Sequence, residues 1–248
     1  MLANNIGEVV ERLDEIIGWS RENRSRLGYF AALYRKVTIE VRQGIADGFF
    51  EDGRRMERLD VAFANRYLEA FYQLRRGDAP TSSWRVAFSA AGDWWPIVLQ
   101  HLLLGMNAHI NLDLGIAAAA VSPGDEIRSL ESDFKRINAI LARLVDDVQG
   151  ELAEIWPALR LLDRVAGRAD DAIVNFSMEK ARQYAWKTAV RLAPLGPAAQ
   201  VDLIRELDRE VAAIGRVVRA PGVILGFVTK IIRLRERGSV ESIIDILR

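Results

Sequence analysis

The chain has 248 residues, half of them apolar, and its 34 basic and 34 acidic side chains give a formal net charge of zero. A chain of this length can bury a substantial core. The charge balance lacks the basic excess typical of nucleic-acid-binding proteins, so we expect no nucleic-acid partner. The absence of cysteine excludes disulfides, thiolate nucleophiles and cysteine-ligated metal centres.

The first residues mix acidic and apolar side chains. Residues 1–22 contain Glu8, Glu11, Asp14 and Glu15 and have no basic segment followed by an apolar block. This pattern is not that of a secretory signal. We therefore expect a cytoplasmic protein.

Apolar residues recur at helical spacing along nearly the whole chain. The pattern predicts helices over residues 6–17, 26–49 and 54–74, a loop over 77–83, a short helix over 84–91, a central helix over about 94–121, and further helices over 126–154, 157–193, 197–218, 223–234 and 240–247. No alternating strand pattern and no nucleotide-binding glycine motif occurs. The predicted fold is an all-α, single-domain multi-helix bundle over residues 1–248, with residues 220–248 as a C-terminal helical appendage.

The central helix from Trp94 to Val121 is long enough to cross a bilayer at about 1.5 Å per residue. Only His101, His109 and Asp113 could carry charge within it. Polar groups near the middle of a span are costly in lipid. We therefore predict a buried bundle helix, which is apolar on most sides because other helices surround it.

Both histidines of the chain lie in this central helix, together with an aspartate and three amides. Each such group costs about 1–3 kcal/mol when it is buried without a hydrogen-bond partner. On an ideal helix, one face carries His101, His109 and Asp113, and the opposite face carries Gln100, Asn107 and Asn111. We expect partners on both flanks, with Asn107 and Asn111 positioning a substrate or the neighbouring helices.

His109 and Asp113 are four residues apart, so their side chains meet on one helix face. Three interpretations remain open: ligands of a divalent metal, a general-base histidine oriented by a carboxylate, and a hydrogen-bonded core pair that only fixes packing. His101 lies roughly 12 Å from His109 along a straight helix. It joins the catalytic group only if Gly105 bends the helix.

Asp60 is the preferred carboxylate from another helix, and with His109 and Asp113 it forms the predicted metal set. Zn, Mn, Fe and Mg are the candidate metals, and a site rich in oxygen ligands favours Mn, Fe or Mg over Zn. Asn65, on the same predicted helix, is a candidate for binding substrate. The alternative is an ordinary amphipathic helix whose polar face is solvated.

Two further groups of side chains suggest binding. Asp171, Asn175, Met178, Arg182 and Trp186 follow helical spacing along one face. Arg182 could bind an anionic substrate group or pair with a carboxylate on a neighbouring helix. In the C-terminal section, basic residues surround an apolar run, a combination that suits contact with a membrane surface or a partner. We favour the simpler interpretation of a solvated helix pair that packs on the bundle.

Two resemblances to known families add to this interpretation. The blocks at residues 29–38, 55–68 and 100–114 resemble the DUF5995 family of uncharacterised bacterial proteins, which implies no catalytic residues. A weaker resemblance links His101, Gly105 and His109 to the zinc-dependent phospholipase C and nuclease group. Met106 stands where that group has an aspartate, and its additional metal-binding histidines have no counterparts here.

The sequence thus predicts a metal-assisted enzyme of hydrolase type that acts on a small molecule. His109 and Asp113 are the principal candidate residues. The alternative is a non-enzymatic protein whose buried polar cluster binds a small ligand or simply fixes the fold.

Overall fold

The computed structural model describes residues 2–155 and 178–248 of the chain. Its elements are α1 (Ile6–Glu22), α2 (Leu27–Ala46), α3 (Gly53–Arg76), α4 (Ser82–Ala90), α5 (Val98–Ala108), the π-helix η1 (His109–Leu114), α6 (Gly115–Val121), the 3₁₀ turn η2 (Gly124–Glu126), α7 (Ile127–Ile155), α9 (Met178–Leu192), α10 (Pro197–Arg219), α11 (Val223–Arg235) and α12 (Val240–Leu247). No strand occurs in the described residues. The predicted all-α fold is confirmed.

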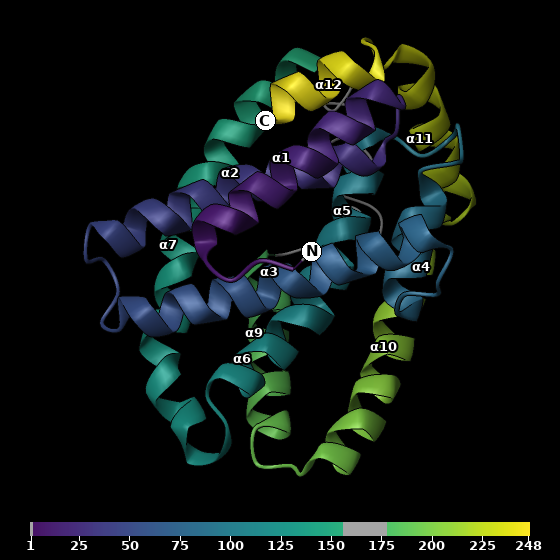
Figure 1. The fold of residues 1–248 in the computed structure, drawn as a ribbon. Helices are drawn as coiled ribbons and strands as arrows, with labels where there is room; N and C mark the ends of the chain where they lie inside the picture. The colour runs from purple at the N-terminus through teal and green to yellow at the C-terminus, as the bar shows by residue number, and fades with distance from the viewer. Residues whose placement is uncertain (1, 156–177) are drawn as a thin grey trace.

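The central helix consists of α5, η1 and α6, which follow one another without a break from Val98 to Val121. α2, α4 and α10 pack against α5, while α3 and α9 pack against η1 and α6. Figure 1 shows α9 and α10 as an antiparallel pair below the crossing helices α1, α2 and α3. Other helices therefore surround the central helix.

This arrangement explains why the central helix is so apolar. It is the one described helix long and apolar enough to cross a membrane, and 83% of its most apolar window is buried inside the protein. A helix enclosed by neighbours can be apolar around its whole circumference. Its burial in the bundle is as predicted.

Local signals in the sequence fix several helix ends. The Asn5 side chain accepts a hydrogen bond from the Glu8 amide at the start of α1, and the Asp52 side chain does the same for Arg55 at the start of α3. Gly77 ends α3 in the left-handed conformation at φ 83°, which glycine adopts without steric cost.

Most predicted helices agree with the structure to within a few residues. The second helix ends at Ala46 rather than Phe49, and the central helix begins at Val98 rather than near Trp94. The predicted helix over 157–193 is described only from Met178 onward, as α9. Its earlier part lies outside the described residues.

The last helix, α12, contributes to the main core. Ile243, Ile244 and Leu247 are buried there with residues of α1 and α2. Ile244 contacts α2 at Gly28, where an added Cβ would lie 2.6 Å from the Ile244 side chain. α12 therefore packs on the bundle rather than extending away from it.

Candidate functional site around His109

The polar part of the central helix is a π-helix. Residues His109 to Leu114 adopt this geometry between two α-helical segments, so each turn there holds more residues than an α-helical turn. The sequence marks Gly105 as the place for either a kink or a close helix crossing. Gly105 lies in regular α-helix, where an added Cβ would be 2.5 Å from the Phe30 ring. It is the site of a close helix crossing.

Asp113 lies at the centre of the polar network and is fully buried. Its Oδ1 accepts a hydrogen bond from Arg66 Nε at 2.7 Å, and its Oδ2 accepts one from Trp84 Nε1 at 2.8 Å. Burial alone would raise the pKa of Asp113, but Arg66 and the bonds from His109 and Trp84 outweigh it, and the pKa is lowered. Asp113 is therefore a carboxylate in the folded protein.

His109 is held in one orientation by Asp113 and by stacking. Its Nδ1 lies 3.4 Å from Asp113 Oδ2, and its ring stacks on Phe63 with centroids 3.6 Å apart. Because a carboxylate only accepts hydrogen bonds, Nδ1 carries the proton. Burial lowers the pKa of His109, and the opposing effect of Asp113 is smaller. The imidazole is therefore neutral, and its Nε2 is left as an acceptor.

Nε2 of His109 is buried and has no hydrogen-bond partner among the described residues. His109 lines a cavity of about 350 Å³, which reaches residues of α2, α3, α5, η1, α7 and α9. One face of the central helix forms an apolar wall of this cavity, through Leu99, Leu103, Met106, Ile110 and Leu114. The size falls within the range of small-molecule sites, which is roughly 300–1,000 Å³.

Asp60 lines the same cavity from α3. Its Oδ2 is buried without a partner within the described part of the chain. Burial, with a smaller contribution from Glu57, raises the pKa of Asp60 to about 7. Near neutral pH this carboxyl group is therefore protonated in part and can donate a hydrogen bond. Tyr34 lines the same cavity, and its hydroxyl is buried without a geometric hydrogen-bond partner among the described residues.

Arg182 lines the cavity from α9 and is buried. Its Nε donates to Asn138 Oδ1 at 2.5 Å, another guanidinium nitrogen donates to the Phe134 carbonyl, and the guanidinium lies over the Phe134 ring. Burial lowers the pKa of Arg182 to about 10, so it stays charged at neutral pH. The predicted companions Asp171 and Asn175 lie outside the described residues.

His101 is not brought to this site. It lines a separate cavity of about 20 Å³ beside Arg26, and its ring packs edge-on against Tyr29. Burial, with smaller contributions from Arg26 and Arg233, lowers the pKa of His101 to about 3. Gly105 lies within the continuous α-helix α5, and the two histidines line different cavities.

The predicted substrate-binding amides contact the backbone and one another. Asn107 Nδ2 donates to the Val211 carbonyl of α10 at 2.9 Å, and Asn111 Nδ2 donates to Asn107 Oδ1 at 2.9 Å. Asn65 exchanges two hydrogen bonds with the backbone of Ala3. Of the two predicted roles of Asn107 and Asn111, these contacts match the positioning of a neighbouring helix.

The predicted metal set of His109, Asp113 and Asp60 is not gathered into one cluster. Within residues 2–155 and 178–248, no group of three or more histidine, aspartate and glutamate side chains could hold a metal ion. Both oxygens of Asp113 already accept hydrogen bonds from Arg66 and Trp84. The geometry suits both other interpretations, a histidine that Asp113 orients and a hydrogen-bonded core pair that only fixes packing.

Several residues that build this site were missed from the sequence. In the sequence, nothing distinguishes Phe63, Tyr34 and Trp84 from ordinary core residues. The structure shows that Phe63 and Tyr34 pack against the His109 ring and that Trp84 donates a hydrogen bond to Asp113. Arg66 could have been found from the sequence. It interrupts an apolar face of α3, and a buried aspartate such as Asp113 needs a cation from a neighbouring helix as its partner.

Comparison with known proteins gives one match. A family model described as "Family of unknown function (DUF5995)" matches residues 6–221. No curated protein and no solved structure matches the chain. The matched residues include the whole site and end before α11 and α12.

Proposed function

This chain belongs to the DUF5995 family, whose function is unknown, and we propose that the protein binds a small, mostly apolar molecule in the cavity beside His109. The observation that supports the proposal is that His109 lines this 350 Å³ cavity while its buried Nε2 has no partner among the described residues. A ligand hydroxyl that donates to Nε2 would satisfy this acceptor. We propose the cytoplasm as the location.

The other polar atoms of the wall suit the same ligand. A protonated Asp60 donates a hydrogen bond, so it complements a ligand oxygen, and Arg182 adds a fixed positive charge. The rest of the cavity wall is mostly apolar and would contact the apolar part of the ligand. A few polar groups in an apolar cavity are the usual composition of a small-molecule site.

Isothermal titration calorimetry with 1-octanol tests the proposal directly. We expect saturable binding at one site, and weaker binding of 1-methoxyoctane, because the ether has no hydrogen to donate to Nε2. The His109→Phe variant keeps an aromatic ring but loses the acceptor. It should bind the alcohol about three- to tenfold more weakly, the effect of one lost hydrogen bond, and should no longer distinguish alcohol from ether.

A cavity-filling variant locates the binding. Met106→Trp places a larger side chain in the cavity and should abolish octanol binding, whereas Ile214→Trp, at an exposed position of α10, should leave it unchanged. The proposal is wrong if neither probe binds the wild-type protein, or if Met106→Trp binds octanol as the wild type does.

The His109–Asp113 pair supports a second candidate function, a hydrolase that uses no metal. A carboxylate that orients a neutral histidine is the arrangement of a general base. His109 Nε2 would take a proton from water as the water oxygen bonds to the ester carbonyl carbon. The carbon–oxygen bond to the leaving group then breaks, and the imidazolium gives the proton to the departing oxygen. With 4-nitrophenyl octanoate, we expect ester cleavage above the buffer rate that His109→Phe removes. Equal rates in the two proteins would reject this function and leave ligand binding intact.

A further inference from the structure

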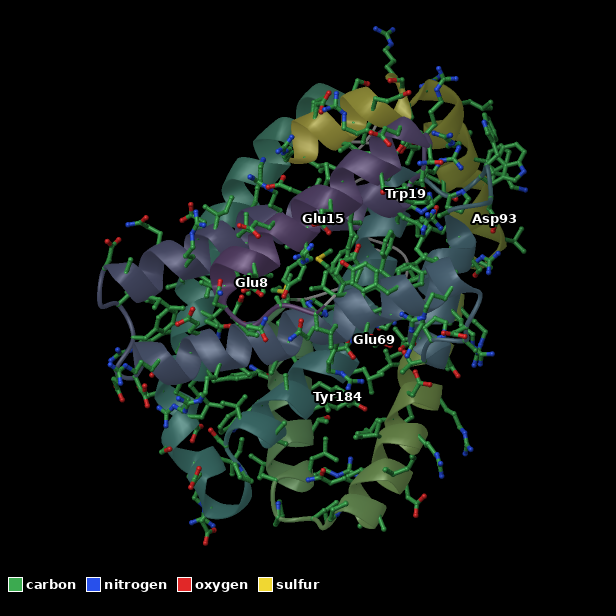
Figure 2. All side chains as sticks on the ribbon, viewed as in Figure 1. Glu8, Glu15, Trp19, Glu69, Asp93 and Tyr184 are labelled. Atoms are coloured by element: carbon green, nitrogen blue, oxygen red, sulfur yellow. The ribbon has the colours of Figure 1, made fainter. Side chains whose placement is uncertain are left out.

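A surface at one edge of the molecule combines exposed aromatic, aliphatic and basic side chains. It is formed by α11 and by the turn that carries Trp94 and Trp95 and leads into α5. Figure 1 shows α11 at the edge of the bundle, and Figure 2 places Asp93, the neighbour of Trp94, at the same edge. We propose that this surface binds the interface of an anionic lipid bilayer.

The apolar residues of this surface are largely exposed to solvent. Val223 is 92% exposed, Phe227 66% and Leu234 69%, and Trp94 and Trp95 are 49% and 50% exposed. The opposite face of α11 already packs on the bundle through Leu225 and Ile232. α11 is therefore apolar on both sides. Contiguous exposed apolar side chains mark a binding surface.

The two tryptophans are held in place by basic side chains of α11. Arg233 Nε donates to the Trp94 carbonyl at 2.7 Å, and its guanidinium carbon lies 4.9 Å from the Trp94 ring centroid. Lys230 Nζ lies 5.2 Å from the Trp95 ring centroid. A turn that is 139 residues away from Arg233 in the chain thus becomes part of the α11 surface. The sequence alone does not connect the two.

The charge of the surface favours anionic lipid. Lys230, Arg235 and Arg237 are exposed on α11 and just after it. The nearby acidic groups are engaged: Glu236 pairs with Arg233 and accepts from the Val98 amide, and Asp93 pairs with Arg219 of α10. The surface therefore carries a positive excess.

Tryptophan and phenylalanine beside lysine and arginine are typical of protein segments that lie in the membrane interface. Basic side chains near an anionic leaflet add electrostatic attraction that salt screens. A protein partner would use the apolar residues but has no general need for this excess of cations. We therefore commit to the lipid surface as the occupant.

Vesicle co-sedimentation of the full chain tests the proposal. We expect binding to vesicles of phosphatidylcholine mixed with phosphatidylserine, at least tenfold weaker binding to pure phosphatidylcholine, and loss of binding as salt is raised. Phe227→Ser combined with Trp95→Ser should lower binding at least tenfold. The variant Lys230→Gln, Arg235→Gln, Arg237→Gln should do the same while keeping the apolar residues.

Matched controls distinguish binding through this surface from nonspecific binding of the protein to vesicles. Val201→Ser with Ile214→Ser removes exposed apolar residues of α10, and Arg205→Gln with Arg209→Gln removes exposed charges of the same helix; both should bind vesicles as the wild type does. Circular dichroism confirms folding of each variant. The proposal is overturned if anionic vesicles do not bind, if the α10 and α11 variants behave alike, or if Phe227→Ser instead disrupts a dimer in solution.

Discussion

At the scale of single residues, the site depends on how one buried carboxylate is paired. Asp113 accepts hydrogen bonds from Arg66 and Trp84, and this pairing keeps it ionised despite full burial. An ionised Asp113 fixes the proton of His109 on Nδ1 and leaves Nε2 unprotonated. Arg66 on α3 and Trp84 on α4 thus determine which nitrogen of His109 is left as a hydrogen-bond acceptor, although neither helix contributes to the histidine motif itself.

Asp60 should make stability depend on pH, and the sign follows from its raised pKa. Its pKa is about 7 in the folded protein, against 3.8 for an unperturbed group. Between these values the folded state keeps a proton that the unfolded state has lost, so the free energy of unfolding falls as pH rises, by at most about 1.4 kcal/mol per pH unit. The slope is halved near pH 7, and about one pH unit higher the effect becomes constant.

Asp60→Asn removes this effect, and urea unfolding of both proteins across the pH range measures it. The stability of the variant relative to the wild type should increase from pH 4 to pH 7 and then level off. His101 and His109, whose pKa values are lowered, cause a loss of stability in both proteins as pH falls, so only the difference is informative. A difference that does not change with pH would contradict the buried, unpartnered state of Asp60.

At the scale of helices, the central helix combines a close crossing with a π-helix. Glycine at position 105 lets Phe30 of α2 approach the helix backbone, and four residues later the π-helix begins at His109. π-helices occur often at functional sites. Here the π-helix contains both His109 and Asp113, so the irregular segment and the polar site coincide.

Gly105→Ala tests the close crossing. An added Cβ would lie 2.5 Å from the Phe30 ring, so the variant should lose about 1–3 kcal/mol of unfolding free energy through overpacking. Gly18→Ala is the matched control, because no atom beyond the local helix backbone lies within 4 Å of a Cβ added there in α1. It should gain roughly 0.5–1 kcal/mol from helix propensity. Urea midpoints that move in the same direction would contradict the crossing.

At the scale of the whole molecule, much of the fold could be predicted from apolar periodicity. The spacing of Ile6, Val9 and Leu13 gives α1, and the clusters around Pro123 and Pro197 mark helix boundaries. Periodicity records only which face of a helix is buried. It cannot identify the facing helix, so the Phe63 stack on His109 and the pairing of Arg66 with Asp113 could not be predicted.

Only part of the site could be predicted, because periodicity does not show which helices face one another. The four-residue spacing of His109 and Asp113 survives the change from α- to π-helix, and the two side chains meet. The metal set required Asp60 and Asp113 to converge, and no local pattern reports such a distance. The opposite amide face was correctly expected to need partners, which α10 supplies through its backbone carbonyls.

Removal of the last helix tests whether α12 belongs to the fold. A chain that ends after Glu236 lacks Ile243, Ile244 and Leu247, which are buried against α1 and α2. Burial of each such side chain contributes about 1.5–3 kcal/mol, so the shortened chain should unfold at a clearly lower urea concentration. An unchanged midpoint would mean that α12 does not stabilise the bundle.

The nitrogen chemical shifts of the two histidines, measured by NMR with and without 1-octanol, test the central claim most directly. The chain has only two histidines, and His109→Phe assigns their signals. We predict that free His109 carries its proton on Nδ1, and that octanol shifts the Nε2 resonance of His109 while both nitrogens of His101 stay unchanged. A proton on Nε2 of His109, or octanol binding that leaves this resonance in place, would contradict the account.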